Sequence, residues 1–204
     1  MVNILSVDFD WIMEPYIEFY NQFADDMSDL NMIVPDLNKI NPYPDLNKFK
    51  LLTTYLYNIS NDIADKNNIY FGKRHSEIKD VIENQWKIRM PIHVYNIDHH
   101  HDCGYKSTLE AIMNDKYRSN NWPLYIDTIK RYTWIGNENS QPFLVEEVVH
   151  HFDQFQQSTD INILNYIKFD YIFVCLSPGW IPKHVLPLYD LLGHIIVHGR
   201  DLNE

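Results

Sequence analysis

Five consecutive ionisable side chains lie in the run 96–102, Asn-Ile-Asp-His-His-His-Asp, directly behind the apolar stretch 92–95. Residues two apart on an extended chain point the same way, so Asp98, His100 and Asp102 share one face. A fold rarely tolerates two carboxylates and an imidazole together at a strand end unless a cation lies among them. The run therefore predicts a metal site.

A second cluster of the same kind opens the chain. Residues 3–10, Asn-Ile-Leu-Ser-Val-Asp-Phe-Asp, have the pattern of a buried strand that ends in two carboxylates, Asp8 and Asp10, on one face. Apolar residues on both faces are typical of a central strand in a parallel sheet, where ligands bind beyond the carboxyl ends of the strands. If this strand and the one before Asp98 are neighbours, the two acidic clusters converge on one spot.

Four aspartates and at least one histidine form a ligand set that suits hard or borderline divalent ions. Mn²⁺ is a good candidate, and Zn²⁺ and Fe²⁺ are alternatives. Four carboxylates exceed what one ion needs for charge balance, whereas two ions about 4 Å apart use them fully. Such a pair lowers the pKa of a water held between the ions, so the residues predict metal-assisted hydrolysis.

Each cluster has a simpler interpretation when it is taken alone. An Asp-x-Asp at a strand end also occurs in solvated turns and helix caps, and a triple histidine also occurs in exposed loops. His75 by itself fits a surface residue at a helix end, and the pair 150–151 lies in a polar stretch that favours the surface. The two acidic clusters together, both behind apolar strands, favour the metal site.

Helical and strand-like segments alternate along most of the chain, which is typical of α/β domains. The pattern predicts a three-layer α/β/α sandwich with a mostly parallel central sheet, in a single domain over residues 1–204. Strands are expected at 3–10, 69–71, 92–97, 132–135 and 171–176. Helices are expected at 14–30, 49–65, 78–86 and 182–192, the last with Gly193 at its C-cap, and shorter ones after 107–110 and from Trp122.

Composition narrows the class of protein. The chain has 204 residues, of which 45% are hydrophobic, so it can bury a sizeable core and is not disordered. Its net charge of −11 and its lack of a basic stripe argue against nucleic-acid binding and favour a cationic partner. The two cysteines, Cys103 and Cys175, imply no disulfide framework, and neither a signal peptide nor a membrane-spanning stretch is recognisable. These features predict a cytoplasmic protein.

The motifs also resemble those of a known family in type and order. The run 98–102 resembles the D-x-H-x-D motif of arginases and other ureohydrolases, and the run 6–10 resembles their S-x-D-x-D motif. In common arginases the second motif comes late, whereas here it comes first, and this layout is similar to the small peptide arginases. Segments like 121–122 and 177–180 follow in that family, so the resemblance spans nearly the entire chain.

The resemblance implies an arginase-like fold and a binuclear manganese centre in which Asp8 and Asp98 bridge the ions. The implied ligands of one Mn²⁺ are His75, Asp98, Asp102 and Asp8, and those of the other are His100, Asp98, Asp8 and Asp10. It further implies a substrate-binding role for Asn121 and Ser177.

The implied reaction acts on arginine side chains in a ribosomally synthesised precursor peptide. A metal-bridging hydroxide attacks the guanidinium carbon, urea is released and ornithine remains. The sequence does not identify the residue that shuttles the proton or the one that binds the guanidinium group. Candidates are Glu14, Glu138, His99 and His101, of which the two histidines are expected to point away from the ligand face.

Two other functions remain open from the sequence. The first is a metal-dependent amidohydrolase or deacetylase on the same architecture, which generally uses one catalytic metal. The second is a non-catalytic peptide-binding protein that keeps the metal site for stability alone. Metal stoichiometry and turnover distinguish these alternatives from an arginase.

Overall fold

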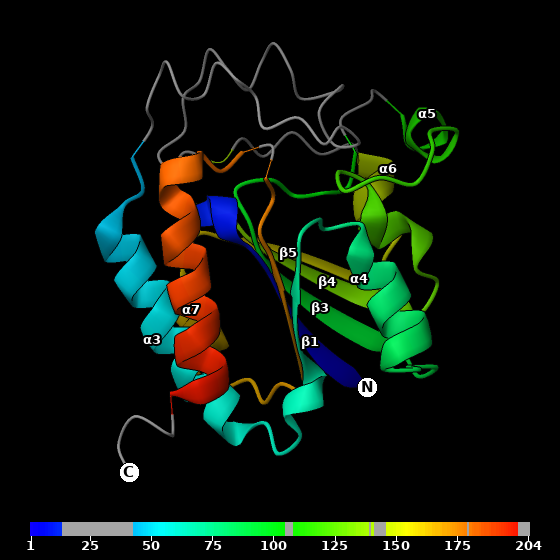
Figure 1. Ribbon diagram of the computed structural model, residues 1–204. Helices are drawn as coiled ribbons and strands as arrows, with labels where there is room; N and C mark the ends of the chain where they lie inside the picture. The colour runs from blue at the N-terminus through cyan, green and yellow to red at the C-terminus, as the bar shows by residue number, and fades with distance from the viewer. Residues whose placement is uncertain (14–42, 105–107, 139, 141–145, 179, 200–204) are drawn as a thin grey trace.

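The computed structural model describes residues 1–13, 43–104, 108–138, 140, 146–178 and 180–199. Their centre is a six-stranded sheet in the order β2-β6-β1-β3-β4-β5, and every neighbouring pair of strands is parallel. Helices cover both faces, as Figure 1 shows, so the predicted three-layer α/β/α sandwich with a parallel sheet is confirmed.

The strands are β1 (Val2–Asp8), β2 (Ile69–Gly72), β3 (Ile92–Ile97), β4 (Ile129–Ile135), β5 (Gln154–Ser158) and β6 (Tyr171–Cys175). The α-helices are α3 (Leu46–Asp62), α4 (Glu77–Asp80), α5 (Leu109–Met113), α6 (Glu146–Val149) and α7 (Leu186–His198). A π-helical turn, η3 (Val81–Gln85), continues α4. Short 3-10 helices complete the set: η1 (Phe9–Ile12), η2 (Lys66–Asn68), η4 (Trp122–Tyr125), η5 (Ile161–Leu164) and η6 (Lys183–Val185).

Two hydrophobic cores lie on opposite faces of the sheet. On one face, α3 and α7 pack against each other and against residues such as Leu5 and Val7 of β1. On the other face, α4, α5 and α6 cover a core that includes Ile4 and Val94. Successive residues of β1 enter alternate cores, as strand geometry requires. Ser6 and Asp8 therefore follow Ile4 toward the α4 face.

The central position of β1 and β3 agrees with their composition. All six residues of β3 and six of the seven residues of β1 are buried. Strands that are covered by helices on both faces need apolar side chains in both directions, which these segments supply.

Several expected elements differ in the structure. The predicted helix 182–192 begins as η6 and α7 and runs to His198, so the prediction that Gly193 caps it is wrong. Gly193 lies inside α7 because the apolar pattern continues past it to the buried Ile196. The sequence analysis missed β5, an edge strand whose polar Gln-Phe-Gln-Gln-Ser segment lacks a buried-strand pattern.

Other predictions agree with the structure within a few residues. The helix expected at 49–65 is α3, which begins earlier because Asp45 caps it by accepting hydrogen bonds from the backbone N–H groups of Asn47 and Lys48. The helix expected at 14–30 lies outside the described residues. Among the described residues, no helix combines the length and the apolar character that crossing a bilayer requires.

Candidate metal centre

The site forms where β1 and β3 end side by side. Val7 pairs with Ile97, so Asp8 and Asp98 are the next residues on the two parallel strands. This confirms the expectation that the two acidic clusters lie on neighbouring strands. The helix described after β1 is α3, which covers one face of the sheet, and the helix described after β3 is α5, which covers the other face. This strand pair is therefore a topological switch point of the sheet.

His75 enters this position from the connection between β2 and α4. Its Nδ1 atom lies 2.8 Å from Asp102 Oδ2, 3.3 Å from Asp8 Oδ2 and 3.4 Å from Asp98 Oδ2. Nδ1 makes no hydrogen bond with any of these oxygens in the described part of the chain. An imidazole nitrogen that faces three carboxylate oxygens without hydrogen-bonding geometry has the arrangement of a ligand set around a cation. We call these four residues the His75 cluster.

A second group lies on the other side of Asp98. His100 Nδ1 lies 3.3 Å from Asp10 Oδ2 and 3.6 Å from Asp98 Oδ1. We call His100, Asp10 and Asp98 the His100 cluster. Asp98 directs Oδ2 toward the His75 cluster and Oδ1 toward the His100 cluster, and these oxygens also accept hydrogen bonds from Asn96 Nδ2 and from the backbone N–H of His100. Asp98 therefore lies between the two clusters, and its predicted bridging role stays a prediction.

All six predicted ligands are therefore brought together, and five of them are buried. The side chain of His100 is the exception, with 21% of its surface exposed, so the site is open to solvent beside this residue. The ring of Trp180 lies there, with its centroid 5.2 Å from that of His100. Asp8 is close to His75 through Oδ2, while its Oδ1 accepts a hydrogen bond from the backbone N–H of Asp10, so its predicted bridging role stays a prediction.

Polar neighbours hold the proposed ligands in place. His75 Nε2 and Ser6 Oγ are 2.7 Å apart, which leaves Nδ1 directed at the carboxylates. Trp122 Nε1 donates a 2.8 Å hydrogen bond to Asp102 Oδ2, and Ser177 Oγ donates one to Asp8 Oδ2. Hydrogen bonds of this kind orient metal ligands in proteins.

Aromatic rings add a second constraint on the His75 imidazole. The ring of Phe173 stacks against it at a centroid distance of 5.8 Å, and the ring of Trp122 lies 5.1 Å away. The His75 side chain is 1% exposed and has little freedom to rotate out of the cluster.

Two site residues adopt left-handed backbone conformations that side chains other than glycine rarely take. Asp102 has φ of 54° and Ser177 has φ of 49°. Strained conformations cost on the order of 1–3 kcal/mol each and persist where the surrounding structure determines them. Here these conformations direct the predicted ligand Asp102 into the site, together with the Ser177 hydroxyl, which donates a hydrogen bond to Asp8.

The charges in the site shift several pKa values. Burial would lower the pKa of His75, but the carboxylates of Asp102, Asp8 and Asp98 hold it well above its ordinary value. Burial raises the pKa of Asp10 to about 6, and the neighbouring Asp8 and Asp98 add to the rise. Without a cation, His75 and Asp10 therefore keep their protons at a higher pH than an exposed histidine or aspartate does.

Other predicted residues have different surroundings. The side-chain amide of Asn121 is hydrogen-bonded to the backbone of the loop before it. Its Oδ1 accepts a hydrogen bond from the backbone N–H of Arg118, and its Nδ2 donates one to the backbone carbonyl of Lys116. The predicted substrate-binding role of Asn121 and Ser177 stays a prediction, because the structure shows these side chains engaged with the loop and with Asp8.

The four candidates for proton transfer or guanidinium binding also differ in position. Glu138 forms a 2.7 Å ion pair with Lys48, and Glu14 lies outside the described residues. His99 and His101 are buried, and neither contributes to a metal-ligand group found among the described residues. His101 Nδ1 instead accepts a hydrogen bond from the backbone N–H of Cys103, so this imidazole supports the loop.

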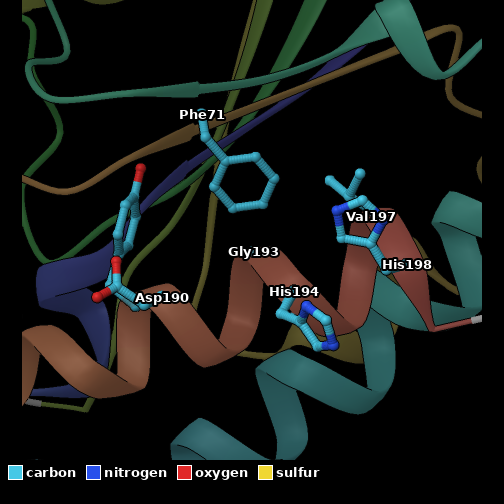
Figure 2. Close-up of a pocket in the computed structure, with 7 residues that line it drawn as sticks. Phe71, Asp190, Gly193, His194, Val197 and His198 are labelled. Atoms are coloured by element: carbon cyan, nitrogen blue, oxygen red, sulfur yellow. The ribbon is translucent and has the colours of Figure 1, made fainter. Parts of the chain in front are cut away.

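A separate pocket of about 380 Å³ lies between α7 and β2 (Figure 2). Phe71, Asp190, His194 and His198 are among its lining residues. Its lining includes no member of the His75 or His100 cluster, so the pocket and the acidic site are distinct.

The residues of the two clusters fit a pair of divalent cations. Four carboxylates carry four negative charges, which two divalent ions balance when both imidazoles are neutral. The buried oxygens of Asp10, which have no hydrogen-bond partner among the described residues, and His75 Nδ1 are the atoms that such ions would satisfy.

Comparison with known proteins found no matching family model, no similar curated protein and no similar solved structure. The assignment of this site therefore depends on its own geometry and on the motifs.

Sequence reasoning missed two residues of the site. Trp122 was expected to begin a helix and to belong to a segment that resembles the family, but no role was predicted for its indole N–H, which donates a hydrogen bond to Asp102. Cys175 was considered only for disulfide formation, whereas its Sγ lies near Asp8 and His75. The signal for Cys175 was available, because it is the last residue of an apolar strand and such residues lie at the ligand-binding edge.

Proposed function

We propose that this protein is a divalent-metal-dependent hydrolase with two ions in the His75 and His100 clusters. The observation that carries the proposal is Asp98, whose two oxygens are shared between two imidazole–carboxylate groups. A single ion would leave one of these groups with buried, uncompensated carboxylate charge. Mn²⁺ is the expected ion for both sites, since the His75 and His100 clusters offer oxygen and imidazole nitrogen.

Within this class, we propose an arginase that acts on arginine side chains in a peptide and releases urea and ornithine. Support for this finer proposal comes from the ordered motifs in the runs 6–10 and 98–102 and from the net charge of −11, which attracts a cationic substrate. Bound ions would supply an activated water and polarise the guanidinium group.

The chain's own residues would then position the substrate and the ligands. The solvent-exposed edge of His100 and the neighbouring Trp180 ring mark the side from which a substrate side chain reaches the site. Trp122 and Ser177 keep Asp102 and Asp8 in orientation, so the ligand set is pre-organised before substrate arrives.

The proposal is tested by mass spectrometry of arginine-containing peptides incubated with the Mn²⁺-loaded protein. Conversion of one arginine to ornithine removes CH₂N₂, a loss of about 42 Da, and releases one urea. Release of acetate from acetylated lysine peptides, without release of urea from arginine peptides, would instead indicate a deacetylase.

The matched variants are Asp98→Asn and Asp153→Asn. Asp153 is an exposed carboxylate before β5, so its variant controls for the loss of one charge. We expect Asp98→Asn to abolish turnover and to lower metal content from about two ions per chain to one or fewer, with Asp153→Asn unchanged. Full metal content in Asp98→Asn would contradict the bridging assignment.

A further inference from the structure

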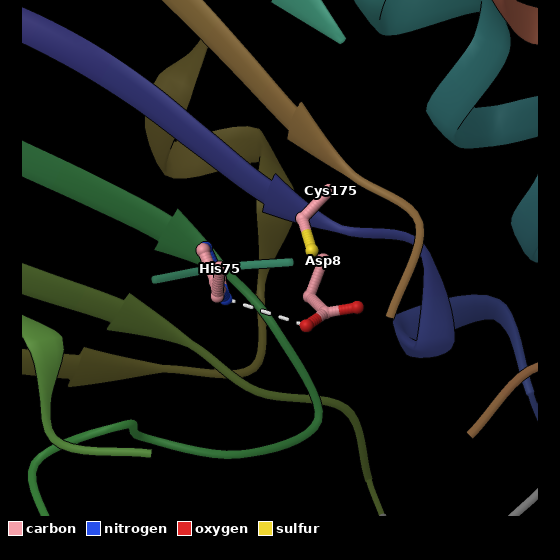
Figure 3. Close-up of side chains that lie close together, drawn as sticks. All are labelled: Asp8, His75 and Cys175. Atoms are coloured by element: carbon pink, nitrogen blue, oxygen red, sulfur yellow. Dashed lines mark ion pairs between the residues drawn. The ribbon is translucent and has the colours of Figure 1, made fainter. Parts of the chain in front are cut away.

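Cys175 is the last residue of β6 and lies opposite Asp8 in the sheet register. Its side chain follows Phe173 toward the α4 face, the same face that Ser6 and Asp8 point to. Figure 3 shows its sulfur directed toward Asp8 beside the His75 ring. The thiol is fully buried at the edge of the metal centre.

The sulfur belongs to a compact group of ligand atoms. One carboxylate oxygen of Asp8, one imidazole nitrogen of His75 and Cys175 Sγ all lie within 4.8 Å of one another. A second group, His75 with Asp98 and Asp102, meets the same criterion. Both groups include His75, and the sulfur is grouped with Asp8 and His75 but not with Asp98 or Asp102.

The surroundings of Cys175 are polar, although the residue is buried. The backbone N–H of Ser177 donates to Sγ at 3.3 Å, Ser177 Oγ lies 3.4 Å away, and the thiol donates to Lys73 O at 3.5 Å. An N–H donor to sulfur fixes the orientation of the side chain, as hydrogen bonds to metal ligands do in proteins. Among the described residues, the other cysteine, Cys103, belongs to no such ligand group, although it too is buried.

We propose that Cys175 is a metal ligand of the His75 cluster, and that the two halves of the centre therefore differ in metal preference. The inference rests on the metal centre of the proposed function but not on its substrate. With sulfur, nitrogen and oxygen donors, the His75 cluster selects a borderline ion such as Zn²⁺ or Co²⁺. The His100 cluster has oxygen and nitrogen donors alone and selects a harder ion such as Mn²⁺.

Coordination replaces the S–H bond of Cys175 with a sulfur–metal bond, and the thiol proton passes to the buffer, so the ligands then carry one negative charge beyond the four of the carboxylates. No oxidant or reductant takes part. The ligand set of Asp8, His75 and Cys175, supported by Asp98 and Asp102, is larger than the all-oxygen-and-nitrogen set that the motifs alone imply.

The test is cobalt absorption spectroscopy of the metal-free, full-length protein. Co²⁺ bound to any of these ligands gives visible d–d bands, whereas only a cobalt–thiolate bond gives a sulfur-to-metal charge-transfer band in the near ultraviolet. We expect both sets of bands in the native protein. The near-ultraviolet band should disappear in Cys175→Ser and persist in the matched control Cys103→Ser.

A competition experiment provides a second measurement. The native protein, loaded with Zn²⁺ in excess Mn²⁺, should retain one Zn²⁺, and Cys175→Ser should bind that ion at least about tenfold more weakly. Far-ultraviolet circular dichroism of both variants verifies that they fold.

The outcomes separate the two proposals. Visible bands without a near-ultraviolet band in the native protein would overturn the role of Cys175 and leave the metal centre intact. Loss of the band in Cys103→Ser alone would also overturn it. Absence of all cobalt bands would overturn the metal centre and, with it, the inference about Cys175. The native spectrum decides between these results even if a variant does not fold.

Discussion

Replacement of Asp10 by Asn offers a quantitative test of the acidic site in the metal-free protein. Asp10 is fully buried, and neither of its carboxylate oxygens has a hydrogen-bond partner among the described residues. Burial, together with Asp8 and Asp98, raises its pKa from 3.8 to about 6, although the nearby His100 acts in the opposite direction. Asn keeps the shape of the side chain and removes the charge.

The size and sign of the effect follow from this pKa. A carboxyl group whose pKa is raised by folding destabilises the fold once it ionises, so the penalty develops between about pH 4 and pH 6 and is complete above that range. A rise of about 2 pKa units corresponds to about 3 kcal/mol. The metal-free Asp10→Asn variant should therefore be about 3 kcal/mol more stable than the native protein near pH 8, and the gain should be about half as large near pH 5.

Thermal unfolding of both proteins, stripped of metal with a chelator, measures this difference. For a chain of this length, about 3 kcal/mol corresponds to a rise in Tm of roughly 6–12 °C. Asp153→Asn serves as the control for an exposed charge and should leave Tm nearly unchanged. Added Mn²⁺ should reverse the order near pH 8, because the native protein gains more from the ion than the variant does.

One result would refute this reasoning directly. If Asp10→Asn lowers the stability of the metal-free protein, or changes it equally near pH 5 and pH 8, His100 already offsets the cost of burying the Asp10 carboxylate in the metal-free fold. The argument that a cation belongs beside it would then lose its energetic basis.

Three further predictions concern metal binding. Trp122→Phe removes the hydrogen bond to Asp102 and should weaken Mn²⁺ binding about 10- to 100-fold in calorimetric titrations; unchanged affinity would mean that the indole does not orient this ligand. Ser6→Ala removes the 2.7 Å contact to His75 Nε2 and should weaken binding about tenfold, with a change of imidazole tautomer visible by nitrogen NMR. Mn²⁺ at about 100 times its Kd should stabilise the native protein by about 2.7 kcal/mol per ion, and a chelator should reverse this gain. If neither Mn²⁺ nor the chelator changes the Tm, the protein does not bind the ion at this site.

The location of the carboxylates could be predicted from local sequence because strand alternation has a period of two. Ser6, Asp8 and Asp98 each follow buried apolar residues at a strand end, and the structure places them at the carboxyl edge of the sheet. The parallel α/β/α class could be predicted for the same reason, since β1 and β3 are apolar on both faces.

The convergence of distant segments was decided by the tertiary structure. Spacing does not specify that β6 lies beside β1, and this placement brings Cys175 and Ser177 to Asp8. The loop before η4 likewise brings Trp122 to Asp102 from 20 residues away. Strand order and loop paths depend on how the helices pack on the whole sheet, a non-local balance of burial and chain connectivity that no short window of sequence contains. The ligand-type residues at each strand end could therefore be predicted from local sequence. That these strand ends meet in one ligand set was determined by the packing of the whole fold.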